Sequence, residues 1–169
     1  MNDRIKELKE VIANSENIVF FGGAGVSTES EIPDFRSKDG LYNQKFEFPP
    51  EEILSYTFFM NHPDEFFRFY KEKMNALPYE PNITHKKLTE LEQSGKLKAI
   101  ITQNIDGLHQ KCGSKNVLEL HGSILRNFCM KCHKLFGAQY VKQTEGIPRC
   151  NICGGLVKLL LHLGFCLAT

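Results

Sequence analysis

Amphipathic patterns predict helices in three parts of the chain. Residues 3–13 carry an apolar stripe at helical spacing, formed by Ile5, Leu8, Val11 and Ile12. Proline and two acids at 63–65 are typical of a helix start, and Thr84 is expected to cap a further helix that ends at Gly95. Phenylalanines crowd the stretch 42–79. The simplest interpretation is the core of a helical insertion at about 42–80, and a groove for an apolar ligand is the alternative.

Short, almost wholly apolar runs predict buried strands at 18–22, 98–102 and 117–120. Because these runs alternate with predicted helices, they indicate right-handed βαβ units and therefore a parallel sheet. The predicted fold class is α/β. In such sheets, ligands bind beyond the carboxyl ends of the strands.

A glycine-rich turn follows the first predicted strand. Gly23 and Gly25 match the start of a dinucleotide-binding fingerprint, whereas Thr28 stands in place of its third glycine. Glycine allows a tight turn and close approach of a ligand to the main chain. The turn therefore suggests a site for a dinucleotide pyrophosphate, and an ordinary strand–turn–helix connection remains open.

Polar residues follow all three predicted strands. The loop at 32–36 ends in Asp34, Phe35 and Arg36, which suits a lid over a planar ligand or, alternatively, a hydrophobic anchor beside two surface charges. After the second strand come Gln103, Asn104 and Asp106, which could bind ribose and carboxamide groups or simply form a turn. His121 follows the third strand as a candidate general base, with a structural histidine as the alternative.

The most specific local pattern is a pair of C-x-x-C motifs, formed by Cys129, Cys132, Cys150 and Cys153. This spacing predicts a structural zinc site in which four thiolates close a tetrahedral shell. A redox role for one pair is the alternative. The adjacent His133 is surplus to the four ligands.

The composition indicates a cellular compartment but no particular binding partner. The 169 residues include 21 basic and 20 acidic side chains, so bulk charge gives no reason to expect nucleic acid or an anionic membrane as a partner. The polar start lacks an apolar signal core, and paired cysteines of this kind are typical of a reducing compartment. We expect a cytoplasmic protein.

Together and in this order, the motifs closely resemble the sirtuins, a family of NAD-dependent protein lysine deacylases. The matching segments are 23–27, 32–36, 102–109, 121–122 and the four cysteines. Glu31 departs from the pattern, because many members have glycine there. The resemblance implies a Rossmann-like domain and a small zinc module, with NAD and an acyl-lysine protein or peptide meeting between them.

The resemblance also implies roles for individual residues. His121 would be the general base, and Asn104 and Asp106 would position the nicotinamide ribose. The acyl oxygen would attack C1′ of that ribose as nicotinamide leaves, and deacetylation is the default activity. The implied NAD-binding residues are Gly23, Ala24, Gly25, Ser27, Asp34, Phe35, Arg36, Gln103, Asn104, Ile105 and Asp106.

The resemblance weakens after Lys158, where an apolar stretch replaces the segments expected to pair with substrate and to complete the nucleotide fold. We therefore divide the chain into an incomplete Rossmann-like part (1–125), a zinc module (126–157) and an atypical tail (158–169). Because the segment after Lys158 differs from the family pattern, we expect weak or no deacylation by this polypeptide. The alternative function is a catalytically inactive zinc-binding fragment. A zinc ribbon that binds nucleic acid would leave the glycine turn unexplained.

Overall fold

The first lobe is built on a parallel three-stranded sheet, as the sequence predicts. A computed structural model describes residues 3–34, 40 and 46–161. Strands β1 (Ile18–Gly22), β2 (Leu97–Thr102) and β3 (Val117–Glu119) lie in the order β1-β2-β3. Gly22 pairs with Thr102, which in turn pairs with Glu119, so the three carboxyl ends meet at one edge.

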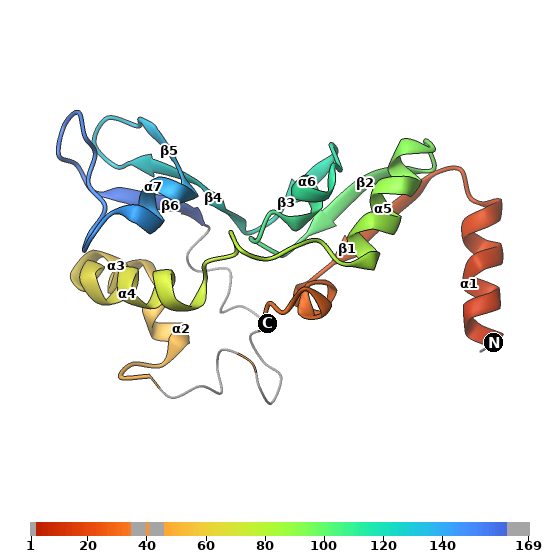
Figure 1. The fold of residues 1–169 in the computed structure, drawn as a ribbon, viewed down its shortest axis with the longest axis horizontal. Coiled ribbons are helices and arrows are strands. Elements are labelled where there is room, and N and C mark those ends of the chain that lie inside the picture. The colour runs from red at the N-terminus through yellow and green to blue at the C-terminus, as the bar shows by residue number, and fades with distance from the viewer. Residues whose placement is uncertain (1–2, 35–39, 41–45, 162–169) are drawn as a thin grey trace.

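One face of this sheet is covered and the other is open. Helix α5 (Ile83–Gln93) packs on the covered face, where Leu88 and Ile100 are buried together, and α6 (Leu108–Cys112) lies beside it (Figure 1). On the opposite face, Val19, Phe21 and Leu118 are 57%, 60% and 51% exposed. An apolar sheet face is therefore in contact with solvent.

Helix α1 (Asp3–Asn14) confirms the first predicted helix, and Lys96 Nζ donates hydrogen bonds to the Ile12 and Ala13 carbonyl oxygens at its carboxyl end. The helix stands apart from both lobes in Figure 1, and none of its 12 residues is buried. Most of its apolar stripe is exposed, Leu8 by 58%, and Ile12 is half-buried. Helical periodicity predicted the helix correctly, but it does not show which surface the apolar stripe would pack against.

The prediction that Thr84 caps the helix before Gly95 is wrong. Asn82 is the N-cap of α5, because its side-chain oxygen accepts the N–H groups of Thr84 and His85, and Thr84 is already helical. Both asparagine and threonine are favoured N-caps, so local preference did not decide between them. The helix ends at Gln93, and Gly95 adopts a left-handed φ of 77° as the chain leaves it.

The second lobe combines an antiparallel sheet with helices. Its strands are β4 (Gly122–Cys129), β5 (Leu135–Gly137) and β6 (Val157–Leu161), in the order β5-β4-β6. Helix α7 (Ala138–Gln143) follows β5. Three helices from the predicted insertion lie below the sheet in Figure 1: α2 (Pro50–Ile53), α3 (Tyr56–Asn61) and α4 (Pro63–Lys73).

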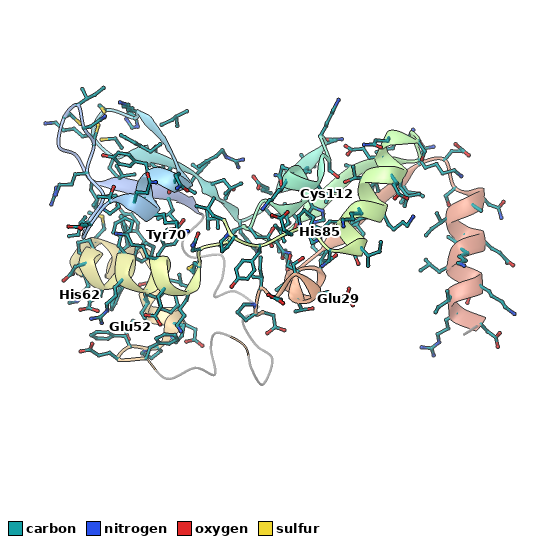
Figure 2. The ribbon with its side chains drawn as sticks, in the orientation of Figure 1. Glu29, Glu52, His62, Tyr70, His85 and Cys112 are labelled. Carbon is teal, nitrogen blue, oxygen red and sulfur yellow. The ribbon has the colours of Figure 1, made fainter. Side chains whose placement is uncertain are left out.

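The phenylalanine-rich helices and the second sheet share one core. Phe59 and Phe66 are fully buried in the same cluster as Ile124, Val157 and Leu159. Tyr70, which Figure 2 shows on α4 pointing toward this sheet, donates a hydrogen bond to the Ile124 carbonyl oxygen at 3.4 Å. The interpretation of the aromatic stretch as core packing is confirmed, and its partner is the cysteine-bearing module.

Two segment boundaries from the sequence analysis fall inside strands. The boundary at 125/126 lies within β4, and β6 includes the first residues of the predicted apolar tail. Residues 162–169 lie outside the described residues. Among the helices that the structure describes, none is long and apolar enough to cross a membrane.

Candidate functional site

Three polar side chains meet where β1 and β2 end. The Ser27 hydroxyl donates to Oδ2 of Asp106 at 2.7 Å and accepts a hydrogen bond from Nδ2 of Asn104 at 3.0 Å. All three side chains are buried. The second carboxylate oxygen of Asp106 accepts the Leu108 N–H at 2.9 Å, which fixes the carboxylate against the start of α6. The structure thus brings together predicted residues that lie 77 and 79 positions apart.

The glycine turn forms two short 3₁₀ helices, η1 (Ala24–Val26) and η2 (Thr28–Ser30), where a longer helix could have followed the strand. A Cβ placed on Gly25 would meet nothing within 4 Å, so the main chain there is open to a ligand. A Cβ on Gly23 would come within 3.2 Å of the Gln103 side-chain oxygen. Gln103 therefore packs against the turn, and its N–H donates to the Gly22 carbonyl oxygen at 2.9 Å.

Glu31 ends the second 3₁₀ helix with a left-handed φ of 66°. This region of backbone conformation favours glycine, so the sequence departs from its resemblance to the sirtuins at a position where the backbone suits glycine. Backbone strain of this kind costs about 1–3 kcal/mol when surrounding contacts maintain it.

His121 lies in the turn between β3 and β4, next to Gly122, whose φ is 82°. The preceding Leu120 N–H donates to the Thr102 carbonyl oxygen at 2.9 Å, which holds the turn against the end of β2. Nδ1 of His121 is buried and has no hydrogen-bond partner among the described residues. This ring nitrogen is therefore not committed to any other described protein group.

The remaining predicted ligand residues are only partly visible. Asp34 is half-buried on the loop that follows the second 3₁₀ helix, whereas Phe35 and Arg36 lie outside the described residues. Ile105 is half-buried, and its carbonyl oxygen accepts the Ile124 N–H at 3.0 Å. This bond connects the polar end of β2 to the first part of β4.

Sequence reasoning missed two buried histidines behind the polar cluster. The rings of His85 and His109 lie 4.7 Å apart between centroids, and Figure 2 shows His85 on α5 close to α6. Burial and the neighbouring His85 lower the pKa of His109 to about 4, while Asp106 opposes that shift. Burial also lowers the pKa of His85, with Asp106 again opposing. Both rings are therefore neutral at pH 7, and only their places in α5 and α6 could have revealed this pairing.

The four cysteines converge as their spacing predicts. Their sulfur atoms all lie within 4.8 Å of one another. The Cys129–Cys153 and Cys132–Cys150 sulfur distances are 3.4 and 3.6 Å, much longer than the roughly 2.05 Å of a disulfide and near the sulfur separation of about 3.8 Å in a tetrahedral zinc–thiolate shell. The group can hold a structural zinc.

Backbone N–H groups support these sulfurs. Burial raises the pKa of the Cys129 thiol, but the N–H groups of Cys132 and Lys131 stabilise its thiolate and bring the pKa down to about 6. Gly155, which sequence reasoning did not single out, is also needed here. A Cβ at this position would lie 2.8 Å from the Cys129 sulfur and 2.8 Å from Lys131 Cβ.

The fold and these two sites define a class: an α/β protein whose parallel sheet presents polar groups at its carboxyl edge, joined to a four-cysteine module. The Sir2 family model matches residues 23–162, and the chain belongs to the Sir2 family. It is 58% identical over 160 residues to an NAD-dependent protein deacetylase of Clostridium perfringens, covering 94% of this chain and 66% of that protein. The corresponding protein of Clostridium acetobutylicum is 61% identical over 159 residues, covering 92% of this chain and 65% of its own.

Solved structures agree with this assignment. A Sir2 variant with a deacetylated p53 peptide and 3′-O-acetyl ADP-ribose superimposes with a TM-score of 0.85 at 36% identity, covering 95% of this chain and 65% of that one. A Sir2 homologue in complex with NAD superimposes with a TM-score of 0.80 at 38% identity, covering 92% and 60%. The chain thus spans about two thirds of the length of the relatives it matches.

Proposed function

We propose that this protein is an NAD-dependent protein lysine deacetylase, a transferase that moves the acetyl group from acetyl-lysine to ADP-ribose. The observation that carries the proposal is the set of Ser27, Asn104 and Asp106, joined by hydrogen bonds beside an open glycine turn. The names of the relatives, NAD-dependent protein deacetylases, support the same chemistry. The predicted cytoplasmic location fits free thiols arranged for a metal.

The proposed residue roles follow from where each group lies. The glycine turn, Gln103 and the Asn104–Asp106 pair would hold NAD, which when bound supplies the ribose carbon that takes the acyl oxygen. Asp106 would orient Ser27 and, through it, Asn104, because the three form one hydrogen-bonded chain. His121 would accept a proton at this edge, since its Nδ1 has no partner among the described residues.

The zinc ion would stabilise the fold of its module and would take no part in the reaction. Four thiolates complete a tetrahedral shell and leave no open position for substrate. The module shares its core with the helices α2–α4, so zinc would set the position of those helices as well. We propose an acetylated protein or peptide as the second substrate.

The test is NAD-dependent deacetylation of an acetyl-lysine peptide. The rate is measured as the release of nicotinamide. The test is run on the 169-residue chain and on a fusion of this chain to the segment that follows the matched region in the Clostridium perfringens relative. We expect the fusion to turn over and His121→Ala in the fusion to lower the rate about 10²- to 10⁴-fold, with NAD binding retained.

Two results would count against the proposal. Full activity of the His121→Ala fusion would remove His121 from the mechanism. A folded, zinc-loaded fusion without any turnover would favour the alternative, a zinc-binding protein that is not an enzyme. Turnover by the 169-residue chain alone would show that the weak activity expected for it is wrong.

A further inference from the structure

The side chain of Asn82 joins the glycine turn to the first turn of α5. Its Nδ2 donates a hydrogen bond to the Val26 carbonyl oxygen at 2.7 Å. Its Oδ1 accepts the Thr84 N–H at 2.9 Å and the His85 N–H at 3.4 Å. The amide oxygen caps the helix and lies 3.0 Å from Nδ1 of His85, and the amide nitrogen reaches 56 residues back along the chain.

Val26, whose carbonyl oxygen accepts this bond, is the last residue of the short 3₁₀ helix η1. Within the turn, the Val26 and Ser27 N–H groups donate to Gly23 and Ala24 at 3.0 Å each. The hydrogen bonds of such short 3₁₀ turns have poorer geometry than those of an α-helix. The next residue, Ser27, is fixed from the other side by Asp106. The turn is thus held between the end of β2 and the start of α5.

We propose that Asn82 is a positioning residue that maintains the glycine turn in the conformation that receives NAD. The inference rests on the proposed function for its ligand. Without the Asn82 bond, residues 24–26 would gain backbone freedom that binding must remove again at a cost in conformational entropy. Helix α5 supplies a rigid anchor because it packs on β2 through buried Leu88.

Two substitutions separate the two functions of the amide. In Asn82→Asp, a carboxylate oxygen still caps α5 but no N–H remains for the Val26 carbonyl oxygen. In Asn82→Ser, the cap is also a favoured one and is neutral, but the side chain is too short to bond Val26. Agreement between the two variants excludes charge repulsion as the cause of any effect.

The matched control is Asn75→Asp. Asn75 follows α4, and its side-chain oxygen accepts the Leu77 N–H at 3.3 Å, a bond that aspartate can also accept. Asn75→Asp makes the same chemical change at a residue that does not contact the glycine turn. The control therefore reports what an asparagine-to-aspartate change does to this protein in general.

The first measurement needs no ligand. Amide hydrogen exchange of the 169-residue chain should quicken about five- to tenfold at residues 24–28 in both Asn82 variants, as expected for the loss of one hydrogen bond. Exchange inside α5 and the melting temperature should change little, because the cap is retained. A merely structural loss would instead raise exchange throughout α5.

The second measurement is calorimetric titration with NAD, made on the fusion used for the deacetylation test. Affinity should fall about five- to tenfold in both Asn82 variants and remain unchanged in Asn75→Asp. Unchanged exchange at 24–28 in the Asn82 variants would overturn the inference, as would loosened exchange with unchanged NAD affinity. If the unsubstituted fusion failed to bind NAD, the proposed function would be in doubt, and exchange at the turn would alone decide whether Asn82 maintains it.

Discussion

Ser27 shows how a single small side chain organises the candidate site. Its hydroxyl donates to Asp106 and accepts from Asn104, so it satisfies two buried polar groups from a different strand end. Buried polar groups without partners cost about 1–3 kcal/mol each, which explains why these three residues occur together. The resemblance to sirtuins placed Ser27 at the nucleotide, and the structure adds that it ties the glycine turn to β2.

His109 makes a residue-scale prediction about acid stability. Its pKa is about 4 in the folded protein, compared with 6.5 for a free side chain. Between those values the unfolded chain binds a proton that the folded chain does not, so the free energy of unfolding falls as pH decreases. The full contribution is present above pH 6.5, and about 3 kcal/mol is lost by pH 4.

The measurement is urea unfolding between pH 7 and pH 4. His109→Gln should flatten the pH dependence relative to the unsubstituted chain, because glutamine does not titrate. His62→Gln, at an exposed ring before α4, is the control for replacing a histidine by glutamine. Acid release of zinc would be common to all three proteins. Equal slopes for His109→Gln and the unsubstituted chain would contradict the assignment.

At the scale of elements, the helices α2–α4 depend on the zinc module. The sequence predicts both parts, but it does not show that the phenylalanines of one pack on the strands of the other. Phe66 of α4 and Val157 of β6 lie in one buried cluster with Cys129. Loss of the metal should therefore loosen helices that contain no zinc ligand.

Replacing Cys132 by alanine tests this dependence. We expect zinc content to fall from one equivalent per chain to nearly none, since zinc binding contributes on the order of 10 kcal/mol to folding in small modules. Metal analysis and hydrogen exchange should show loss of zinc together with faster exchange in residues 56–73.

Cys112→Ala is the matched control, because Cys112 is a free thiol on α6 outside the four-cysteine group. It should keep one zinc and normal exchange. Slow exchange in α4 of a zinc-free Cys132→Ala protein would show that the helices are stable without the module.

At the scale of the whole molecule, the described residues leave one face of the parallel sheet apolar and exposed. Phe21 and Leu118 lie in register with Ile101 on the face that α5 does not cover. Contiguous exposed apolar patches of this kind promote association. We expect the chain to self-associate as its concentration rises.

Phe21→Thr should weaken that association about tenfold, because threonine keeps strand propensity but removes an apolar ring of which 60% is exposed. Sedimentation velocity over a concentration series measures the effect. Leu135→Thr is the control, since Leu135 is 77% exposed on the other lobe. An equal effect of both substitutions would show that association does not depend on the sheet face.

The sequence by itself determined most local elements and the four-cysteine group. Hydrophobic spacing is sufficient for β1–β3 and α4, because burial of a strand or helix face imposes its own period on the chain. The paired cysteines were equally clear, since four thiolates at that spacing suit few structures besides a zinc site. The strand-end rule placed Asn104, Asp106 and His121 at one sheet edge but left a turn and a structural histidine open, and only the resemblance to the sirtuins implied their roles.

Only the tertiary structure decided which surfaces meet. The choice of Asn82 over Thr84 as N-cap, the His85–His109 pair and the need for glycine at 155 all depend on contacts between residues far apart in sequence. Local preference cannot resolve such choices, because several residues satisfy it equally and the difference in free energy comes from a distant partner. The same reason explains why the open face of the sheet became visible only when the helices had been placed.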